Sequence, residues 1–543
     1  MTTTTSEGRG AVLDTAHVGD IRGALGTIKL GDDAPRKGMS AKFKTLLAII
    51  GPGLIVMVGD NDAGAFATYG QAGQNYGTHL LWTLLLLVPV LYVNQEMVLR
   101  LGAVTGVGHA KLIFARFGKF WGAFSVVDLF LLNALTLVTE FIGITLAVGY
   151  LGLPKDLSVI LAAAVIVASA FTGSFRRFER IAISLCAGSL LLIPIYFVAH
   201  PAASQMAHSF VVPSMPAGNG GMATLMLLII GIVGTTVAPW QLFFQQSYVI
   251  DKRITPRFMR YEKADLSLGI VVVVIGAAAV MGFTATVFAH TAGFGNFTDA
   301  AGIAHGLEAY AGRAVGVLFA IALLDASIIG AFAVSLSTAY AIGDTFGINH
   351  SLHRGVKGAK GFYAVYAGLV GIAATIVLIP GSPLGLLTEG VQTLAGVLLP
   401  SATVFLLLLC NDKQVLGPWV NGPKTNAFTA AVVGILVTLS IVLTASVLFP
   451  NITAATIMQI MGTCGVAGVI AAGYAVTVRR TAGTREDPID RLGRDEWRMP
   501  SLETLTRPTM SATRKIGMGA LRLYLAVAMI LVIVKLVGMA FGH

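Results

Sequence analysis

Charge is scarce in this sequence. Asp, Glu, Lys and Arg make up 12% of its 543 residues, whereas 55% are hydrophobic. A soluble protein with this balance would have too little polar surface to cover its apolar core. The composition therefore excludes a soluble protein and predicts an all-α polytopic membrane protein, in agreement with a mean hydropathy of +0.79.

Cysteine is also rare, which limits the covalent and metal chemistry open to the chain. The three cysteines are far apart and lie in or beside apolar runs, so neither a disulfide framework nor a CxxC metal motif is expected. The opening "MTTTTSEGRGAVLDTAHVGD" has no apolar core of the signal-peptide kind. We expect residues 1–45 to form a flexible cytoplasmic N-terminal tail.

Several functional motifs are missing as well. The sequence shows no HExxH, no GxSxG in an apolar run and no phosphate-cradling loop, so it predicts neither an enzyme nor a bound cofactor. A Lys/Arg stripe interleaved with aromatic residues is also absent, which argues against a nucleic-acid partner despite the net charge of +10. The expected partners are the lipid bilayer and a small substrate, and the oligomeric state is left open.

Long apolar runs are abundant. About 20 apolar residues suffice to cross the ~30 Å hydrocarbon core. We identify thirteen candidate spans, at 46–72, 78–103, 121–150, 157–173, 180–199, 222–249, 266–290, 313–345, 361–380, 385–410, 427–449, 454–478 and 519–540. Lys and Arg concentrate in alternate loops, and the positive-inside rule then predicts a multi-pass protein of the cell (inner or plasma) membrane with a cytoplasmic N-terminus.

The first span contains an unusual polar run, "GDNDAGAFATY". It places Asp60, Asn61 and Asp62 near mid-bilayer, where a charge costs about 2.5–3.5 kcal/mol per residue. Such carboxylates persist where they meet a hydrated cavity or a cation, and Gly64 weakens the helix beside them. A break here would also free the Gly59 carbonyl, which is tolerated at membrane depth only where it lines a cavity or packs on protein.

The sixth span carries a second helix breaker. Pro239 removes a helix donor and clashes with the preceding turn, directly after Gly-Thr-Thr at 234–236. Interruptions in spans one and six are typical of inverted-repeat transporters with a midplane site. We therefore expect a 5+5 arrangement, with a first repeat at 46–200, a second at 201–416, two further spans at 417–478, a cytoplasmic linker at 479–517 and a C-terminal span at 518–543.

The tenth span offers a third polar face. Glu389 and Gln392 are three residues apart and share one side of a helix, and Pro400 kinks its second half. A Gln in a membrane helix serves either as a ligand or as a helix–helix hydrogen bond, and both alternatives stay open for Gln392. Glu140 in span three and Asp325 in span eight could relay protons, pair with a partner or pack into a polar seam.

At these motifs the sequence resembles the Nramp family of divalent-metal transporters, from about residue 51 to 416. "GPGLIVMVGDNDAGAFATYGQAGQNYGTHLLW" is similar to the family's first span, whose Asp-Pro-Gly-Asn signature falls on Asp62, Ala63, Gly64 and Ala65. "GTTVAPWQLFFQQSYV" is similar to the sixth-span pattern "GATVMPHNLFLHSSLV". The resemblance implies a LeuT-like fold, with discontinuous helices 1 and 6 and additional C-terminal helices, and a substrate site between those helices.

The differences from the family pattern concern the expected metal ligands. Ala238 stands where the family has a metal-binding Met, a soft ligand that helps to select transition metals. What remains is oxygen, which suits partly hydrated Mg²⁺. The chain is thus most similar to the Nramp-related magnesium transporter branch. The expected site comprises Gly59, Asp60, Asn61, Asp62, Thr235, Ala238 and Gln392.

Other substitutions bear on proton coupling. Trp240 and Gln245 replace two family histidines, and Leu137 replaces an acidic partner, whereas Glu140 is kept. Histidine titrates nearest neutrality, so its loss predicts weak or absent coupling. Trp240, Gln241, Gln245, Glu140 and Glu389 are candidates for a relay or for supporting the ligands. The alternatives are a proton-coupled Mn²⁺/Fe²⁺ transporter and a symporter for an organic cation or amino acid.

Overall fold

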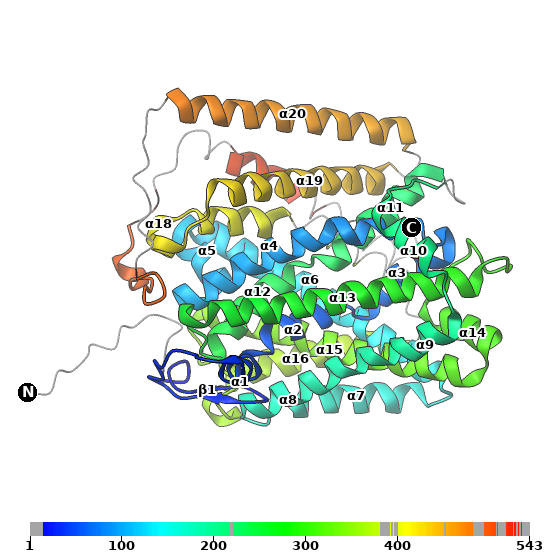
Figure 1. The fold of residues 1–543 in the computed structure, drawn as a ribbon, viewed down its shortest axis with the longest axis horizontal. Coiled ribbons are helices and arrows are strands. Elements are labelled where there is room, and N and C mark those ends of the chain that lie inside the picture. The colour runs from blue at the N-terminus through cyan, green and yellow to red at the C-terminus, as the bar shows by residue number, and fades with distance from the viewer. Residues whose placement is uncertain are drawn as a thin grey trace, which may run out of the picture.

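The computed structural model describes residues 15–216, 221–380, 400–449, 452–481 and 493–506, together with Val391, Ala395 and short pieces between 508 and 534. Within this part of the chain, nine helices are long and apolar enough to cross a membrane, or ten if one bent pair counts as a single span. The long helices lie side by side in one bundle (Figure 1). The helical fold class predicted from the composition is confirmed.

The bundle is built from helices, and its few strands form one small hairpin. The first half of the chain contains β1 (Ile21–Arg22), β2 (Thr27–Ile28), α1 (Met39–Ile49), α2 (Pro52–Val58), α3 (Ala63–Tyr76), α4 (Trp82–Thr105), α5 (His109–Phe117), α6 (Lys119–Tyr150), α7 (Lys155–Ala170), α8 (Phe175–Cys186), the 3-10 helix η1 (Ala187–Leu191), α9 (Leu192–Ala199) and α10 (Ala203–Val211).

The second half continues with further spans and short connections. It contains α11 (Gly221–Thr236), α12 (Pro239–Asp251), η2 (Pro256–Phe258), α13 (Met259–Phe288), α14 (Ala300–Ala311), α15 (Arg313–Phe346), η3 (Val356–Gly358), α16 (Lys360–Leu378), α18 (Lys413–Leu416), η4 (Gly417–Trp419), α19 (Pro423–Leu448), α20 (Ala454–Thr481) and η5 (Leu502–Thr504). An additional apolar helix covers Pro400–Cys410.

Most expected spans coincide with these helices. The run at 121–150 is α6, and the run at 180–199 is formed by α8, η1 and α9. The expected tenth and thirteenth spans, 385–410 and 519–540, lie largely outside the described residues. The division of the chain into two repeats at 46–200 and 201–416 stays a prediction.

The N-terminal segment differs from the expected flexible tail. Residues 15–38 carry an antiparallel hairpin in which Ile21 pairs with Ile28, and α1 follows. Arg176 and Arg180 of α8 hold this hairpin, because their Nε atoms donate to the carbonyls of Gly23 and Ala24 at 3.1 and 3.0 Å. These bonds satisfy backbone groups that a free tail would leave to water, so the prediction is corrected for residues 15–45.

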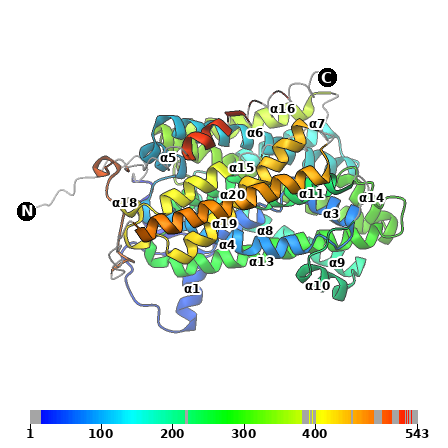
Figure 2. The same cartoon turned by 90° about the horizontal axis from the view of Figure 1, so that it is seen from above.

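The centre of the bundle surrounds α12. This helix packs against α4 and α15, while α13 runs along α2 and α3, and α6 runs along α15. In contrast, α20 lies at the outer edge of the bundle and packs on α19 (Figures 1 and 2). The buried centre is therefore formed by the spans that include the two predicted helix breaks.

Candidate metal site

The first span is interrupted at the polar run. α2 ends at Val58, Gly59 caps it, and α3 begins at Ala63. Asp62 is the N-cap of α3, with its Oδ1 accepting a hydrogen bond from the Ala65 N–H at 2.9 Å. This is the normal role of Asp at a helix start, and it turns the chain out of helical geometry over residues 59–62. The predicted break is confirmed.

The sixth span is interrupted as well. α11 ends at Thr236, and α12 starts at Pro239 with Ala238 as an extended N-cap residue (φ −86°, ψ 142°). Proline is well placed at a first helical position, where the missing N–H would have no partner within the helix. Thr235 and Ala238 therefore flank the start of a new half-helix, as predicted.

Hydrogen bonds join the two breaks directly. The Gln241 side chain of α12 donates from Nε2 to Asp60 Oδ1, and its Oε1 accepts from Gln95 Nε2 of α4 at 2.8 Å. Beside them, the Tyr69 hydroxyl of α3 and the Thr236 hydroxyl of α11 lie 2.8 Å apart. Polar groups from four helices thus meet at one level of the bundle.

Three buried oxygens at this junction have no hydrogen-bond partner among the described residues. They are Asp60 Oδ2, Asn61 Oδ1 and Glu140 Oε1. Asp60 is fully buried, and Asn61 and Asp62 are 4% and 5% exposed. Unsatisfied buried oxygens cost free energy, and a bound cation is one means of satisfying them. Asn61 also donates from Nδ2 to the Val273 carbonyl of α13 at 3.2 Å.

Glu140 lies against the start of α3. Its Oε2 accepts a hydrogen bond from the Ala63 N–H at 3.2 Å. The neighbouring position on α15 is Gly330, where a Cβ atom would stand 2.8 Å from Glu140 Cδ and 2.9 Å from Asp62 Cβ. Only glycine leaves room for both carboxyl side chains at this crossing.

Two of the remaining predicted residues, Trp240 and Gln245, belong to α12. Trp240 is buried next to Gly59, and its carbonyl accepts a hydrogen bond from Ser337 Oγ at 2.9 Å. Gln245 is fully buried, and neither its Oε1 nor its Nε2 has a partner in the described part of the chain. Glu389 and Gln392 lie outside the described residues.

Gln95 and Tyr69, whose hydrogen bonds connect the breaks, were not among the predicted site residues. Both are polar side chains within apolar runs, and that was the available signal. Within the described residues, no three His, Cys, Asp or Glu side chains converge on one point. The junction therefore offers single carboxylate and amide oxygens rather than a closed cage of charged ligands.

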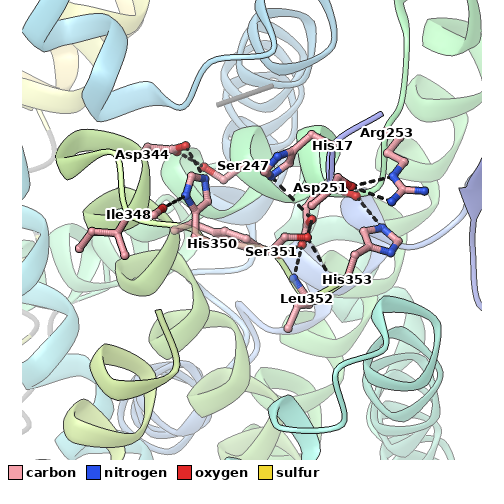
Figure 3. A network of polar contacts seen from close by, with 12 residues as sticks. His17, Ser247, Asp251, Arg253, Asp344, Ile348, His350, Ser351, Leu352 and His353 are labelled. Atoms are coloured by element: carbon pink, nitrogen blue, oxygen red, sulfur yellow. Dashed lines mark hydrogen bonds and ion pairs between the residues drawn. The ribbon is translucent and has the colours of Figure 1, made fainter. Parts of the chain in front are cut away.

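A second buried polar cluster occupies the opposite end of α12 (Figure 3). Asp251, the last residue of α12, accepts hydrogen bonds from the Tyr340 hydroxyl, the Ser351 hydroxyl and the Leu352 N–H. Beside it, His350 Nε2 lies 2.9 Å from Asp344 Oδ1. Burial alone would lower the pKa of His350, but the Asp344 carboxylate outweighs it and raises this pKa to about 9.

Comparison with known sequences gives one family and a consistent set of relatives. The family described as "Natural resistance-associated macrophage protein-like" (Nramp) matches residues 53–446. The divalent metal cation transporter MntH of Ralstonia nicotianae is 31% identical over 406 residues, which cover 71% of this chain and 88% of the relative. The MntH of Burkholderia ambifaria is 30% identical over 328 residues, and this match covers 56% of this chain and 69% of the relative.

Solved structures share the fold at lower sequence identity. A manganese transporter of Eremococcus coleocola, crystallised with an aromatic bis-isothiourea compound, is similar with a TM-score of 0.65 at 20% identity; the match covers 83% of this chain and 99% of that protein. A Na⁺-coupled sialic acid symporter in a substrate-bound outward-open state gives a TM-score of 0.50 at 11% identity, over 78% of this chain and 89% of the symporter. The fold is LeuT-like, and the chain belongs to the Nramp family, whose members are membrane transporters and not enzymes.

Proposed function

We propose that this protein transports divalent cations by alternating access, and that its main substrate is partly hydrated Mg²⁺. One observation carries the choice of ion. The two helix breaks meet around carboxylate, amide and carbonyl oxygens, while Ala238 occupies the position at which the family pattern has a sulfur ligand. The donor set that remains is hard, which favours Mg²⁺ over softer metals.

The hydration chemistry of the ion supports the same choice. Mg²⁺ loses its waters reluctantly and is usually held by one or two carboxylates together with several waters. Asp60 supplies a buried oxygen without a partner, and Asn61 supplies another. The side chain of Ala238, at the N-cap of α12, is smaller than a Met side chain, which favours an ion that keeps part of its water shell.

Alternating access requires the half-helices to move around a fixed site. Asp60 would receive the ion at the first break, carbonyls near Gly59 and Thr235 would complete its shell, and Gln392 would approach from the tenth span. The burial of Asp60, Asn61 and Asp62 corresponds to a conformation in which protein covers the junction. Opening on either side would then expose the ion to water.

Inward flow would be driven by the membrane potential. Each charge gains about 2.3 kcal/mol per 100 mV, so a dication gains about twice that without any proton. Trp240 and Gln245 do not titrate near neutrality, which supports weak or absent proton coupling. In proteoliposomes, Mg²⁺ uptake should proceed without acidification of the lumen; acidification that tracks uptake would contradict this part of the proposal.

A second candidate is proton-coupled Mn²⁺ transport. The observation in its favour is external to the site: the structural relative from Eremococcus coleocola is a manganese transporter, and the sequence relatives are divalent metal cation transporters. Glu140 and Asp62 would then serve as the proton carriers. The absence of a sulfur ligand at Ala238 argues for Mg²⁺ over this candidate.

Metal uptake by three proteins distinguishes the candidates. Vesicles containing wild type, Asp62→Ala or Ala238→Met are supplied with Mg²⁺ and Mn²⁺ separately and in competition. We expect wild type to take up Mg²⁺ in the presence of equal Mn²⁺, Asp62→Ala to lose uptake of both ions, and Ala238→Met to shift preference toward Mn²⁺. Wild type that takes up Mn²⁺ and excludes Mg²⁺ would overturn the choice of Mg²⁺ and leave the second candidate.

The predicted location follows from the same elements. We place the protein in the cell membrane as a multi-pass transporter with its N-terminus in the cytoplasm. The support for this orientation is the Lys/Arg content of alternate connections, such as the segment at 252–263, which runs from the end of α12 into the first turns of α13.

A further inference from the structure

A pocket of about 380 Å³ lies away from the helix breaks, between α4, α13, the start of α19 and the segment at 493–506. Glu96, Arg100, Lys263, Trp419 and Arg494 are among its lining residues. It belongs to the end of the bundle that carries α5 and α18, which Figure 1 shows at the left. This is the end that loop charge predicts to be cytoplasmic.

The lining carries an excess of positive charge. Glu96 accepts from both Arg100 and Lys263, with contacts of 3.1 Å from Arg100 Nη2 and 2.8 Å from Lys263 Nζ. A third cation, Arg494, lies over the Trp419 ring at 4.8 Å from its centroid. Arg494 Nε also lies 3.5 Å from Oδ1 of the adjacent Asp495, so the three lining cations are paired with two carboxylates, Glu96 and Asp495, and one net positive charge remains. A lining of this kind attracts an anion.

Arg100 is the buried and fixed member of this group. It is 6% exposed, and its guanidinium donates to the Trp419 carbonyl and, at 2.6 Å, to Asn421 Oδ1. Its Nε–H has no partner among the described residues. A guanidinium held by several bonds with one donor unused is pre-organised for an oxyanion.

The start of α19 adds a second kind of anion-binding group. Gly422, its N-cap, provides no side-chain cap, and the first turn contains no acidic residue. Gly422 and Thr425 both line the pocket. Pro423, the first residue of α19, has no N–H, but the N–H groups of Lys424 and Thr425 that follow it have no acceptor within the helix, and together with the helix dipole they favour negative charge.

We propose that this pocket binds a phosphate-bearing anion. A phosphate group would accept from the buried Arg100 Nε–H and from the N–H groups at the start of α19, and its charge would be balanced by Lys263 and Arg494. Two sources share this chemistry, namely the headgroup of an anionic phospholipid and a soluble phosphate compound. Neither source depends on which metal ion the helix breaks carry.

Thermal unfolding of the purified full-length protein tests the proposal in two arms. One arm adds inorganic phosphate to the protein in a neutral detergent, with sodium chloride at matched ionic strength as reference. The other compares vesicles of phosphatidylcholine with vesicles of phosphatidylcholine and phosphatidylglycerol in equal amounts. A rise of the unfolding midpoint in the first arm identifies a soluble source, and a rise in the second arm alone identifies a lipid headgroup.

Matched variants connect the effect to the pocket. Lys263→Gln and Arg494→Gln each remove a lining cation whose side chain is 35% or 38% exposed, so both variants should retain the fold. Lys357→Gln removes the same charge from an exposed position in η3 that does not line the pocket. We expect the two pocket variants to require about tenfold more anion for the same shift of the unfolding midpoint, and Lys357→Gln to behave as wild type.

Two results would overturn the proposal. One is the absence of any rise of the midpoint with phosphate or with phosphatidylglycerol. The other is an equal response of all three variants, because a general effect of surface charge would then explain the stabilisation. The Arg100 side chain is left unchanged throughout, since its bonds to Trp419 and Asn421 also hold the α18–α19 connection in place.

Discussion

Buried polar groups lie at both ends of α12, but the two ends differ in whether the buried oxygens have hydrogen-bond partners. At its start, near Pro239, the polar junction leaves Asp60 Oδ2 and Asn61 Oδ1 without partners. At its end, Asp251 accepts hydrogen bonds at both carboxylate oxygens, from Ser351 and Leu352 (Figure 3) and also from Tyr340. One helix therefore connects an unsatisfied polar cluster with a satisfied one.

This difference indicates which carboxylate stabilises the fold and which one serves transport. A buried carboxylate with a full set of donors strengthens the fold, because removing it leaves those donors unpaired. A buried carboxylate with an unused oxygen costs stability, and such a cost persists where a ligand can bind. We therefore expect substitutions at the start of α12 to affect transport and substitutions at its end to affect folding.

The largest expected effect is the loss of transport in Asp60→Ala. Without this carboxylate the junction loses the buried oxygen, Oδ2, that has no partner in the described part of the chain, and Mg²⁺ uptake should fall to the level of empty vesicles. The unfolding midpoint should stay the same or rise, since an unsatisfied buried group is removed. Uptake assays and thermal unfolding on the same preparation measure both. A variant that transports normally would remove Asp60 from the site.

The next effect is on stability at the other end of the helix. Asp251→Ala leaves the Tyr340 and Ser351 hydroxyls and the Leu352 N–H without their acceptor. We expect a loss of about 3 kcal/mol, measured as a lower unfolding midpoint in detergent. The folded fraction should still take up Mg²⁺. An Asp251→Ala protein as stable as wild type would refute the contrast between the two ends.

A pH-dependent stability is expected from His350 in the same cluster. Its pKa in the folded protein is raised to about 9 by Asp344, against an ordinary value of about 6.5. The stabilisation from the charged imidazole is therefore complete below about pH 6.5 and is lost as the pH rises through about 9. The unfolding midpoint of wild type should fall across this range more than that of His350→Gln.

The variant Asp344→Asn provides the control for that measurement. It keeps a side chain of similar size beside His350 but removes the negative charge that raises the histidine pKa. Its midpoint should show the same reduced pH dependence as His350→Gln. A full wild-type dependence in both variants would assign the effect to other groups.

The smallest effect is expected for Tyr69→Phe. This substitution removes the hydroxyl that lies 2.8 Å from Thr236 Oγ1 and joins the half-helices α3 and α11. One hydrogen bond contributes about 1 kcal/mol, so uptake should fall by at most about fivefold with little change in stability. Initial rates of Mg²⁺ uptake measure this change. A complete loss of uptake would give Tyr69 a direct role in binding the ion.

Both helix breaks were predictable from the sequence. The Asp-Asn-Asp run and Pro239 are local signals, because a charge in lipid and a proline within a helix are costly wherever the rest of the chain lies. The resemblance to Nramp sequences added the pairing of the two breaks. Which oxygens would lack partners was not predictable, because that depends on side chains such as Gln95 and Gln241, which are 146 positions apart.

The ordered N-terminal hairpin was not predictable for the same reason. Residues 15–38 are polar, and their composition is typical of a tail. Hydrogen-bond donors far along the chain hold this segment in place. Arg176 donates to the carbonyl of Gly23, 153 residues away, and Arg253 donates to the Ala16 carbonyl. Local composition gives no information on contacts at this separation. The segment at 493–506 docks similarly, with the Met499 N–H donating to the Val104 carbonyl at 3.3 Å.

The outermost helix has a consequence for how the protein is handled. Within the described part of the chain, only 6% of the most apolar stretch of α20 is buried, so acyl chains are expected to contact most of its exposed surface in a membrane. Its tilt and height are then set by bilayer thickness rather than by neighbouring side chains. Vesicles made from shorter or longer lipids should displace α20 relative to the bundle while the centre around α12 keeps its shape.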